Sequence, residues 1–317
     1  MTPFSDSQTI SDSSNNALRE RFRAQGYVIL DDVVDSALLH AALESLELAQ
    51  NSNQGSRRGV QRSDRYNKAG KVDFAKIPNL AKNNEAFRQL ASAESVVNAV
   101  ELLLGQQALI FRDVLILKPA RDGGPLDYHQ DSEYWDVEPR ALISAWIPFR
   151  DVGLENGCLR VIEGSHQRRY RHDLFLGEGL RLPYWMTSLL RRMASLSGTG
   201  DSDASGFSAM RKLKNSILGG WTKHVSSLGK LQELHARISE VEERREANLP
   251  IRAGSAILFH SMLLHASNPN TSDWDRHAYI VSYMGSEYLF RGVGNPEFLV
   301  AGERNRRVYR PVRRFDA

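Results

Sequence analysis

A series of short apolar segments restricts the fold more than any other feature of the chain. Each is too short for a typical helix, and glycine, proline, aspartate or asparagine separates it from the next. Segments of this length and spacing predict β-strands, and many short strands in succession are typical of two packed sheets of the jelly-roll or barrel kind. The predicted strands lie at residues 109–111, 114–117, 142–149, 158–162, 255–259 and 277–284.

Helical patterns flank and interrupt these strands. We therefore predict a mainly β protein with flanking helices, whose double-stranded β-helix (jelly-roll, cupin-like) core contains an inserted helical segment. At 317 residues the chain fits one elaborated domain, residues 1–317. Its expected parts are a helical N-terminal part at about 16–105, a β-core at about 106–166 and 251–290, and a helical insertion or lid at about 167–250.

Charge and cysteine content exclude several classes of protein. Lys and Arg number 41 against 38 Asp and Glu, a net charge of +3, and they are spread along the chain, so no nucleic-acid-binding surface is predicted. The lone cysteine, Cys158, excludes an internal disulfide and any multi-cysteine metal site. The N-terminus lacks the features of a signal peptide, and no apolar segment reaches the roughly 18 residues of a transmembrane helix. We expect a cytoplasmic protein.

The segment between the two strand groups is basic. From 181 to 230 it contains eight Lys or Arg and two Asp, in a helical pattern that the serine- and glycine-rich stretch 197–206 interrupts. One hypothesis is an inserted pair of helices with a solvated basic face. The other is a lid at an active-site mouth that binds an anionic or carrier-bound substrate, or that lies on a membrane surface. The sequence leaves both open.

Three residues have the side chains of a mononuclear iron site. On a β-strand residues i and i+2 project to the same face, so His129 and Asp131 can bind one metal while Gln130 points away. His265, from a distant segment, completes the two histidines and one carboxylate that bind Fe(II) on one side and leave positions open for chemistry. Taken singly, each is better explained as an exposed or hydrogen-bonded polar group. His260 competes for the third position.

Four elements in a fixed order resemble the phytanoyl-CoA dioxygenase family of Fe(II)- and 2-oxoglutarate-dependent oxygenases. They are Tyr128-His129-Gln130-Asp131, the signature from Glu155 to His166, the segment Gly254–Phe259 followed by His265–Asn270, and Arg276. The resemblance extends from about residue 26 to residue 285 and excludes most of 167–250. Because Arg276 follows His265 at the family's spacing, the resemblance favours His265 over His260 as the distal ligand.

The resemblance implies Fe(II), 2-oxoglutarate and O2 as cofactor and co-substrates. Arg276 would bind the far carboxylate of 2-oxoglutarate, since a guanidinium makes two parallel hydrogen bonds to a carboxylate, and Ser282 shares its strand face. The expected reaction hydroxylates an unactivated C–H bond of a small organic metabolite in a biosynthetic pathway, releasing succinate and carbon dioxide. An acyl-CoA or carrier-bound substrate, and a metal-binding cupin-like protein without oxygenase activity, are the alternatives. The oligomeric state is not predicted.

Aromatic residues near the metal motif give a weaker prediction. Tyr128, Tyr134, Trp135 and Trp146 could line a substrate pocket, although aromatic residues beside strands are more often part of the core. Asn156-Gly157 predicts a tight turn rather than a catalytic group. Cys158 is expected to be a small buried apolar residue.

Overall fold

The computed structural model describes residues 6–52, 62–135, 137–169, 175–176, 180–181, 245–290, 298–300 and 308–309. The chain separates into two compact units, one formed by Met1–Arg169 with Arg244–Ala317 and the other by Tyr170–Glu243. In the second unit, the described residues form one antiparallel pair, β9 (Phe175–Leu176) and β10 (Leu180–Arg181). The predicted helical insertion and nearly all of its basic stretch lie outside the described residues.

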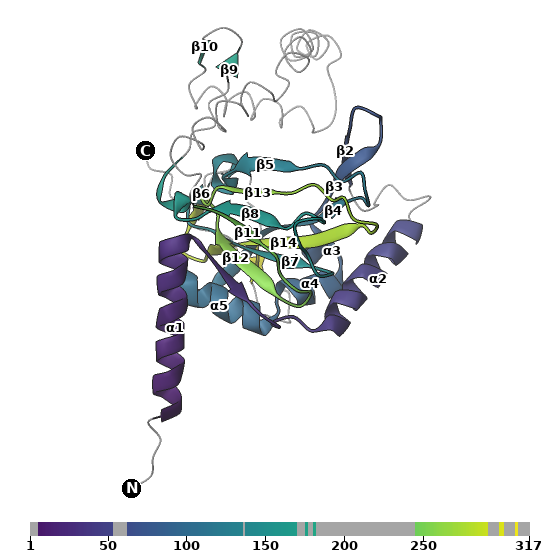
Figure 1. The fold of residues 1–317 in the computed structure, drawn as a ribbon. Helices are drawn as coiled ribbons and strands as arrows, with labels where there is room; N and C mark the ends of the chain where they lie inside the picture. Colours follow the sequence, from purple (N-terminus) through teal and green to yellow (C-terminus); the bar gives the residue numbers. More distant parts are fainter. Residues whose placement is uncertain are drawn as a thin grey trace, which may run out of the picture. The chain divides into compact units, whose positions relative to one another are not determined.

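The first unit is built on two antiparallel sheets (Figure 1). The larger sheet has the strand order β1-β12-β7-β14-β4-β16-β17, and β3 also pairs with β4 and with β2. Its strands are β1 (Tyr27–Leu30), β2 (Ser63–Tyr66), β3 (Val72–Pro78), β4 (Ala108–Lys118), β7 (Ile143–Pro148), β12 (Ala256–His260), β14 (Arg276–Gly285), β16 (Phe298–Val300) and β17 (Val308–Tyr309).

The smaller sheet has the order β11-β8-β13-β5. These strands are β5 (Leu126–His129), β8 (Leu159–Ile162), β11 (Glu246–Leu249) and β13 (His265–Ser267), and a separate pair joins β6 (Val137–Glu138) to β15 (Leu289–Phe290). Each sheet combines strands from both sides of the 170–243 segment, as expected of a jelly roll. The predicted mainly β double-stranded β-helix is confirmed.

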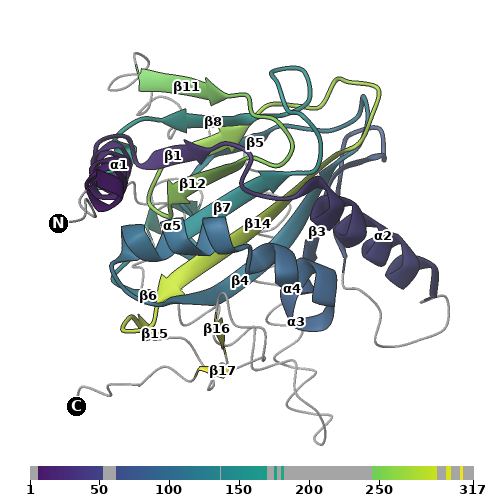
Figure 2. The same cartoon turned by 90° about the horizontal axis from the view of Figure 1, so that it is seen from below.

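The helices are α1 (Asp6–Gln25), α2 (Ser36–Ser52), α3 (Leu80–Asn83), α4 (Glu85–Ala91) and α5 (Glu94–Leu104), and short 3-10 helices follow as η1 (Asp131–Tyr134) and η2 (Ser165–Gln167). Helices α3, α4 and α5 lie along one face of the larger sheet, whereas α1 lies at its edge beside β1 (Figure 2). Apolar positions such as Phe87, Leu90 and Val96 are fully buried against the sheet. Burying side chains of this size contributes about 1.5–3 kcal/mol each, so the helix layer is a main source of stability.

Strand β14 shows how the sheet divides two environments. Its odd-numbered residues Tyr279, Val281 and Tyr283 belong to the core beneath the helices, whereas Ala278 and Ile280 pack with residues of the smaller sheet. This alternation follows from the two-residue period of a strand. Residues that share a face with Ala278 therefore lie between the two sheets, where the site forms.

A buried carboxylate fixes the helices to the sheet. Asp113 of β4 accepts hydrogen bonds from the backbone N–H groups of Leu80 and Ala81 and from the Tyr279 hydroxyl. Burial raises its pKa, although these hydrogen bonds oppose the rise. The carboxyl is thus provided with partners, which explains how the core holds a polar group at this position.

The turn from α1 into β1 requires glycine. Gly26 has φ +85°, and a Cβ there would lie 2.5 Å from Nδ1 of His166 and 2.8 Å from Leu263. Glycine adopts this left-handed conformation without penalty and ends the helix. The turn brings the end of α1 against the 3-10 helix η2, which contains His166.

The structure differs from the predicted layout at two boundaries and in one hairpin. The helical insertion was predicted to reach 250, but Glu246–Leu249 forms β11, because its backbone completes the edge of the smaller sheet beside β8. The N-terminal helix begins at Asp6 rather than near 16, and the β2–β3 hairpin lies within the part expected to be helical. Among the described residues, no helix is long and apolar enough to cross a membrane.

Candidate metal centre

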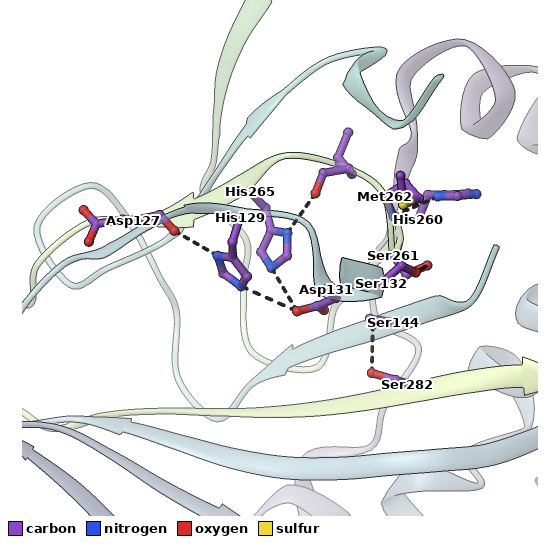
Figure 3. Close-up of polar contacts among 11 residues, drawn as sticks. Asp127, His129, Asp131, Ser132, Ser144, His260, Ser261, Met262, His265 and Ser282 are labelled. Atoms are coloured by element: carbon purple, nitrogen blue, oxygen red, sulfur yellow. Dashed lines mark hydrogen bonds and ion pairs between the residues drawn. The ribbon is translucent and has the colours of Figure 1, made fainter. Parts of the chain in front are cut away.

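The three predicted ligands converge between the sheets. His129 is the last residue of β5, His265 is the first residue of β13, and the two are register partners. One ligand atom from each of them and one from Asp131 all lie within 4.8 Å of one another. Nε2 of His129 is 3.5 Å and Nε2 of His265 is 3.9 Å from Oδ1 of Asp131 (Figure 3).

The route by which Asp131 reaches the site differs from the prediction. Strand β5 ends at His129, Gln130 is extended, and Asp131 begins the 3-10 helix η1. The predicted continuous strand from 129 to 131 was therefore wrong, although both side chains still converge. Gln130 is fully buried and donates its amide to the carbonyls of Met262 and Arg168, which holds the chain in place at this change of direction.

Backbone carbonyls orient both imidazoles. Nδ1 of His129 lies 2.8 Å from the carbonyl of Asp127, and Nδ1 of His265 lies 3.0 Å from that of Leu263. Because a carbonyl only accepts hydrogen bonds, each Nδ1 carries the proton, and each Nε2 presents a lone pair toward Asp131. Hydrogen bonds of this kind fix the tautomer and ring direction of metal-binding histidines.

Electrostatics favour the charge states that a metal requires. Burial and, to a smaller extent, the neighbouring His129 lower the pKa of His265 to about 4, so the imidazole is neutral at pH 7. Burial alone would raise the pKa of Asp131, but His265, His129 and Arg112 together bring it to about 2. The site thus offers a neutral imidazole at His265 and an ionised carboxylate at Asp131, and with His129 these are the residue types of non-haem iron centres.

His260, the competing candidate, lies elsewhere. Its ring contacts Phe22 and His166, with centroids 6.2 and 5.2 Å away, and its Nδ1 accepts a hydrogen bond from the backbone of Met262. Burial lowers its pKa to about 4. It therefore belongs to the contact between α1 and the core, and the preference for His265 agrees with the geometry.

Arg276 is buried on the face of β14 that also carries Ala278. It is 2% exposed, its guanidinium lies 5.6 Å from the centre of the Trp146 ring, and among the described residues it has no carboxylate partner. Burial lowers its pKa to about 9, so it remains charged at neutral pH. Its Nε has no hydrogen-bond partner in the described part of the chain. A buried cation with an unused donor suits an anionic ligand.

Lys118 is a second buried basic residue, which the sequence did not reveal. It is the register partner of Arg276, and its amine donates to the carbonyls of Ser267 and Asn268. Burial, with Arg276 and Arg65 nearby, lowers its pKa to about 6. A charged residue two positions after Ile116 on the inward face of a strand was the available signal. Its hydrogen bonds hold the turn that follows His265.

A family model described as phytanoyl-CoA dioxygenase (PhyH) matches residues 22–278. This match spans most of the chain and includes all three predicted ligands. The chain belongs to the phytanoyl-CoA dioxygenase family. The resemblance seen in the sequence motifs is thereby confirmed.

Curated relatives in this family are distant. The mouse phytanoyl-CoA dioxygenase domain-containing protein 1 is 27% identical over 214 residues, which are 67% of this chain and 57% of the mouse protein. The human peroxisomal phytanoyl-CoA dioxygenase is 24% identical over 210 residues, 65% of this chain and 47% of the human protein. The chain thus matches about half the length of these relatives.

Solved structures show the same fold at low identity. The carbocyclase SnoK from nogalamycin biosynthesis has a TM-score of 0.59 and 19% identity, covering 87% of each chain. The epimerase SnoN, in complex with Fe3+, alpha ketoglutarate and nogalamycin RO, has a TM-score of 0.58 and 17% identity over 89% of this chain and 88% of its own. EctD from S. alaskensis with bound Fe gives 0.57 and 18%, over 94% of this chain and 86% of its own.

The remaining predicted residues of this family member divide between the site and the core. Ser282 faces the site, and its hydroxyl lies 2.9 Å from that of Ser144. Trp146 is buried beside Arg276, and Trp135 is buried in a cluster with Leu109 and Met284. Cys158 is buried, as predicted, and burial raises the pKa of its thiol.

Of the two predicted pocket tyrosines, Tyr128 does not join the described site. Tyr128 packs beneath the guanidinium of Arg160, whose neighbour Val161 faces inward, so it lies on the outer face of the smaller sheet. Strand alternation, with His129 turned inward, explains this placement. The side chain of Tyr134 is outside the described part of the structure. Gly157 has φ +86°, as the predicted turn requires.

Proposed function

We propose that this chain is a non-haem Fe(II)- and 2-oxoglutarate-dependent dioxygenase. The proposed reaction hydroxylates an unactivated C–H bond of a small organic metabolite in a biosynthetic pathway and releases succinate and carbon dioxide. The convergence of His129, Asp131 and His265 within 4.8 Å carries the proposal. Family membership supports it.

The residues present fit iron and 2-oxoglutarate. Two imidazole Nε2 atoms and one carboxylate would hold the metal on one side and leave the other side for an oxoacid and oxygen. When bound, iron and 2-oxoglutarate supply the oxidising chemistry that converts a C–H bond to an alcohol. The protein's own part is to bind, orient and shield the reactants.

Arg276 would orient the co-substrate. Its buried guanidinium can make two parallel hydrogen bonds to the far carboxylate, which would turn the oxoacid end toward the histidines. Trp146 covers one side of the guanidinium and excludes water from it. Ala278, two residues along β14, is a small buried residue on the same face.

Turnover in the absence of the primary substrate tests the proposal. Purified full-length protein with Fe(II) and 2-oxoglutarate should consume oxygen and form succinate slowly. Asp131→Ala should abolish this turnover, whereas Asp64→Ala, which removes a half-buried carboxylate paired with Arg62 in the β2–β3 hairpin, should leave it unchanged. Succinate formation equal in wild type and Asp131→Ala would overturn the proposal.

The alternative substrates need a separate comparison. The acyl-CoA or carrier-bound hypothesis depends on the basic 181–230 stretch, nearly all of which lies outside the described residues. Product formation from a series of free acids and from the corresponding CoA thioesters discriminates between the two. A metal-loaded protein that turns over none of them, and that forms no succinate, would favour the silent cupin-like alternative.

A further inference from the structure

A second inward-facing arginine lies on the larger sheet at a different position from Arg276. Arg112 of β4 is the register partner of Ser282, which is in turn the partner of Ser144 of β7. Directly paired residues project to the same face of a sheet, so these three side chains form one row. The next residue along β4, Asp113, points to the helices, which independently places Arg112 on the opposite face.

This row of residues reaches the metal ligands. Ser144 is also the register partner of Phe259 on β12, and the Phe259 ring contacts that of His265 with centroids 4.7 Å apart. Figure 3 draws the hydrogen-bonded Ser144–Ser282 pair below Asp131. With strands about 4.8 Å apart, Arg112 is within side-chain reach of the space beside the metal site.

The guanidinium of Arg112 is held over an aromatic ring rather than by a carboxylate. It lies 5.6 Å from the centre of the Trp135 ring. In the part of the chain that the structure describes, no carboxylate is within ion-pair distance of it. Stacking fixes a guanidinium in direction but leaves its hydrogen-bond donors unused.

Trp135 supplies a second unused donor. The residue is 7% exposed, and its indole nitrogen has no hydrogen-bond partner among the described residues. Buried indole N–H groups ordinarily have a partner, and the described residues supply no acceptor here, so this donor is available to a ligand. Arg112 and Trp135 together thus offer a cation and a neutral donor side by side.

Arg112 and Arg276 lie too far apart along the sheet to serve as one binding site. The guanidinium of Arg276 contacts Trp146, the register partner of Ile280, whereas Arg112 lies beside Ser282, further along β14. One dicarboxylate bound to the metal has one free end, and Arg276 would bind it. The second cation is therefore available to the primary substrate.

We propose that Arg112 and Trp135 bind a carboxylate of the primary substrate and so select acidic metabolites. This inference rests on the proposed function and adds the substrate class to it. The hydroxyls of Ser144 and Ser282, on the same row, would face the substrate between this carboxylate and the metal ligands. Arg112 is exposed, so a substrate can reach it from solvent.

A binding comparison tests the inference without knowledge of the natural substrate. The full-length protein, loaded anaerobically with Fe(II) and 2-oxoglutarate, is titrated with a set of monocarboxylates (butyrate, octanoate, benzoate, phenylacetate and indole-3-acetate) and with their primary amides. Thermal stabilisation and the visible charge-transfer band of the iron–oxoglutarate complex are both recorded. Retention of the band shows that an acid has not displaced 2-oxoglutarate.

Acids should stabilise wild type more than their amides do. Arg112→Met should weaken acid binding roughly 10- to 100-fold, as expected for loss of a charge-assisted contact, and abolish the preference for acids. Arg112→Lys should retain part of it. Arg252→Met, which removes an exposed arginine paired with Asp32, should behave as wild type.

Two results would overturn the inference. One is that no acid stabilises wild type more than its amide, and the other is that the preference survives in Arg112→Met. If wild type itself forms no charge-transfer band, the proposed function fails. If wild type and Arg112→Met both form the band but wild type does not prefer acids to amides, the proposed substrate class is rejected and the proposed function stands.

Discussion

The helix-facing residues of β14 differ in kind from those that face the smaller sheet. Tyr279 and Tyr283 are fully buried and donate their hydroxyls to groups within the core, Asp113 for the first and the carbonyl of Ala91 for the second. On the other face, Arg276 keeps a donor without a partner among the described residues. The buried polar groups of one face are paired within the fold, whereas the other face keeps a buried donor that has no partner in the described part of the chain and that a ligand would fill under the proposed function.

This difference separates stability from function within one strand. Filled, hydrogen-bonded cores tolerate little change in volume or polarity. Buried groups without partners cost stability and persist where a ligand supplies the missing contact. Substitutions on the helix side should therefore change the free energy of unfolding, and those between the sheets should change binding.

The largest expected effect is a difference in Fe(II) affinity between variants of two nearby histidines, His265 and His260. His265→Ala should lower Fe(II) affinity by at least about 100-fold, more than loss of an outer-shell contact does, with little change in melting temperature. His260→Ala should instead retain iron and lose about 1–3 kcal/mol of stability, because a buried hydrogen bond to Met262 is lost. Metal titration measures the Fe(II) affinity of each variant, and thermal unfolding measures its stability. Equal iron affinities would contradict the assignment of His265.

The helix side is tested by Leu90→Ala. Leu90 is fully buried beneath the helices, so its truncation should cost about 2–5 kcal/mol of unfolding free energy. Leu48→Ala, at a leucine 70% exposed on α2, should change stability by less than about 0.5 kcal/mol. Urea unfolding gives both values. The affinity for 2-oxoglutarate should be unchanged in both variants, and a large change in Leu90→Ala would show that the two faces are coupled.

Between the sheets, Arg276→Met should raise the 2-oxoglutarate concentration required for half-maximal succinate formation by roughly 10- to 100-fold. The maximal rate should fall less, because the metal ligands are intact. Arg276→Lys should recover only part of the loss, since an ammonium cannot make the two parallel hydrogen bonds. An unchanged requirement in Arg276→Met would withdraw the role assigned to Arg276.

The smallest effect concerns acid stability. Burial holds the pKa of His260 at about 4 in the fold, below its ordinary 6.5, so folding favours the neutral form. The contribution is complete above pH 6.5 and is lost as pH falls toward 4, on the order of 1–2 kcal/mol at pH 5. His260→Gln should therefore show a weaker loss of stability between pH 7 and 5 than wild type. If the unfolding free energies of wild type and His260→Gln fell equally between pH 7 and 5, His260 would not be the cause of the acid sensitivity.

Much of the site could be predicted because each of its residues belongs to a short, recognisable sequence motif. His129, Asp131, His265 and Arg276 stand in motifs whose residue types have few other uses together, and the two-residue period of β14 assigned Ser282 to the face of Arg276. The path of the chain through Asp131 was not predictable in the same way. The 3-10 turn there depends on contacts of Gln130 and Ser132 with the distant segment 261–262.

The missed elements depend on partners far along the chain. The sequence Glu246–Leu249 has one buried apolar residue, and it forms a strand because β8 provides hydrogen-bond partners. Lys118 was missed because its burial depends on the turn at Ser267 and Asn268. Arg112 gave no signal alone, since only strand register places it in a row with Ser144 and Ser282.

The central claim is that His129, Asp131 and His265 bind one ferrous ion that also binds 2-oxoglutarate. Anaerobic addition of Fe(II) and then 2-oxoglutarate to the full-length protein tests it directly. We expect one iron per chain and a visible charge-transfer band that appears only with 2-oxoglutarate and that is absent in Asp131→Ala. A wild-type protein that binds no iron, or whose band persists in Asp131→Ala, would contradict the account.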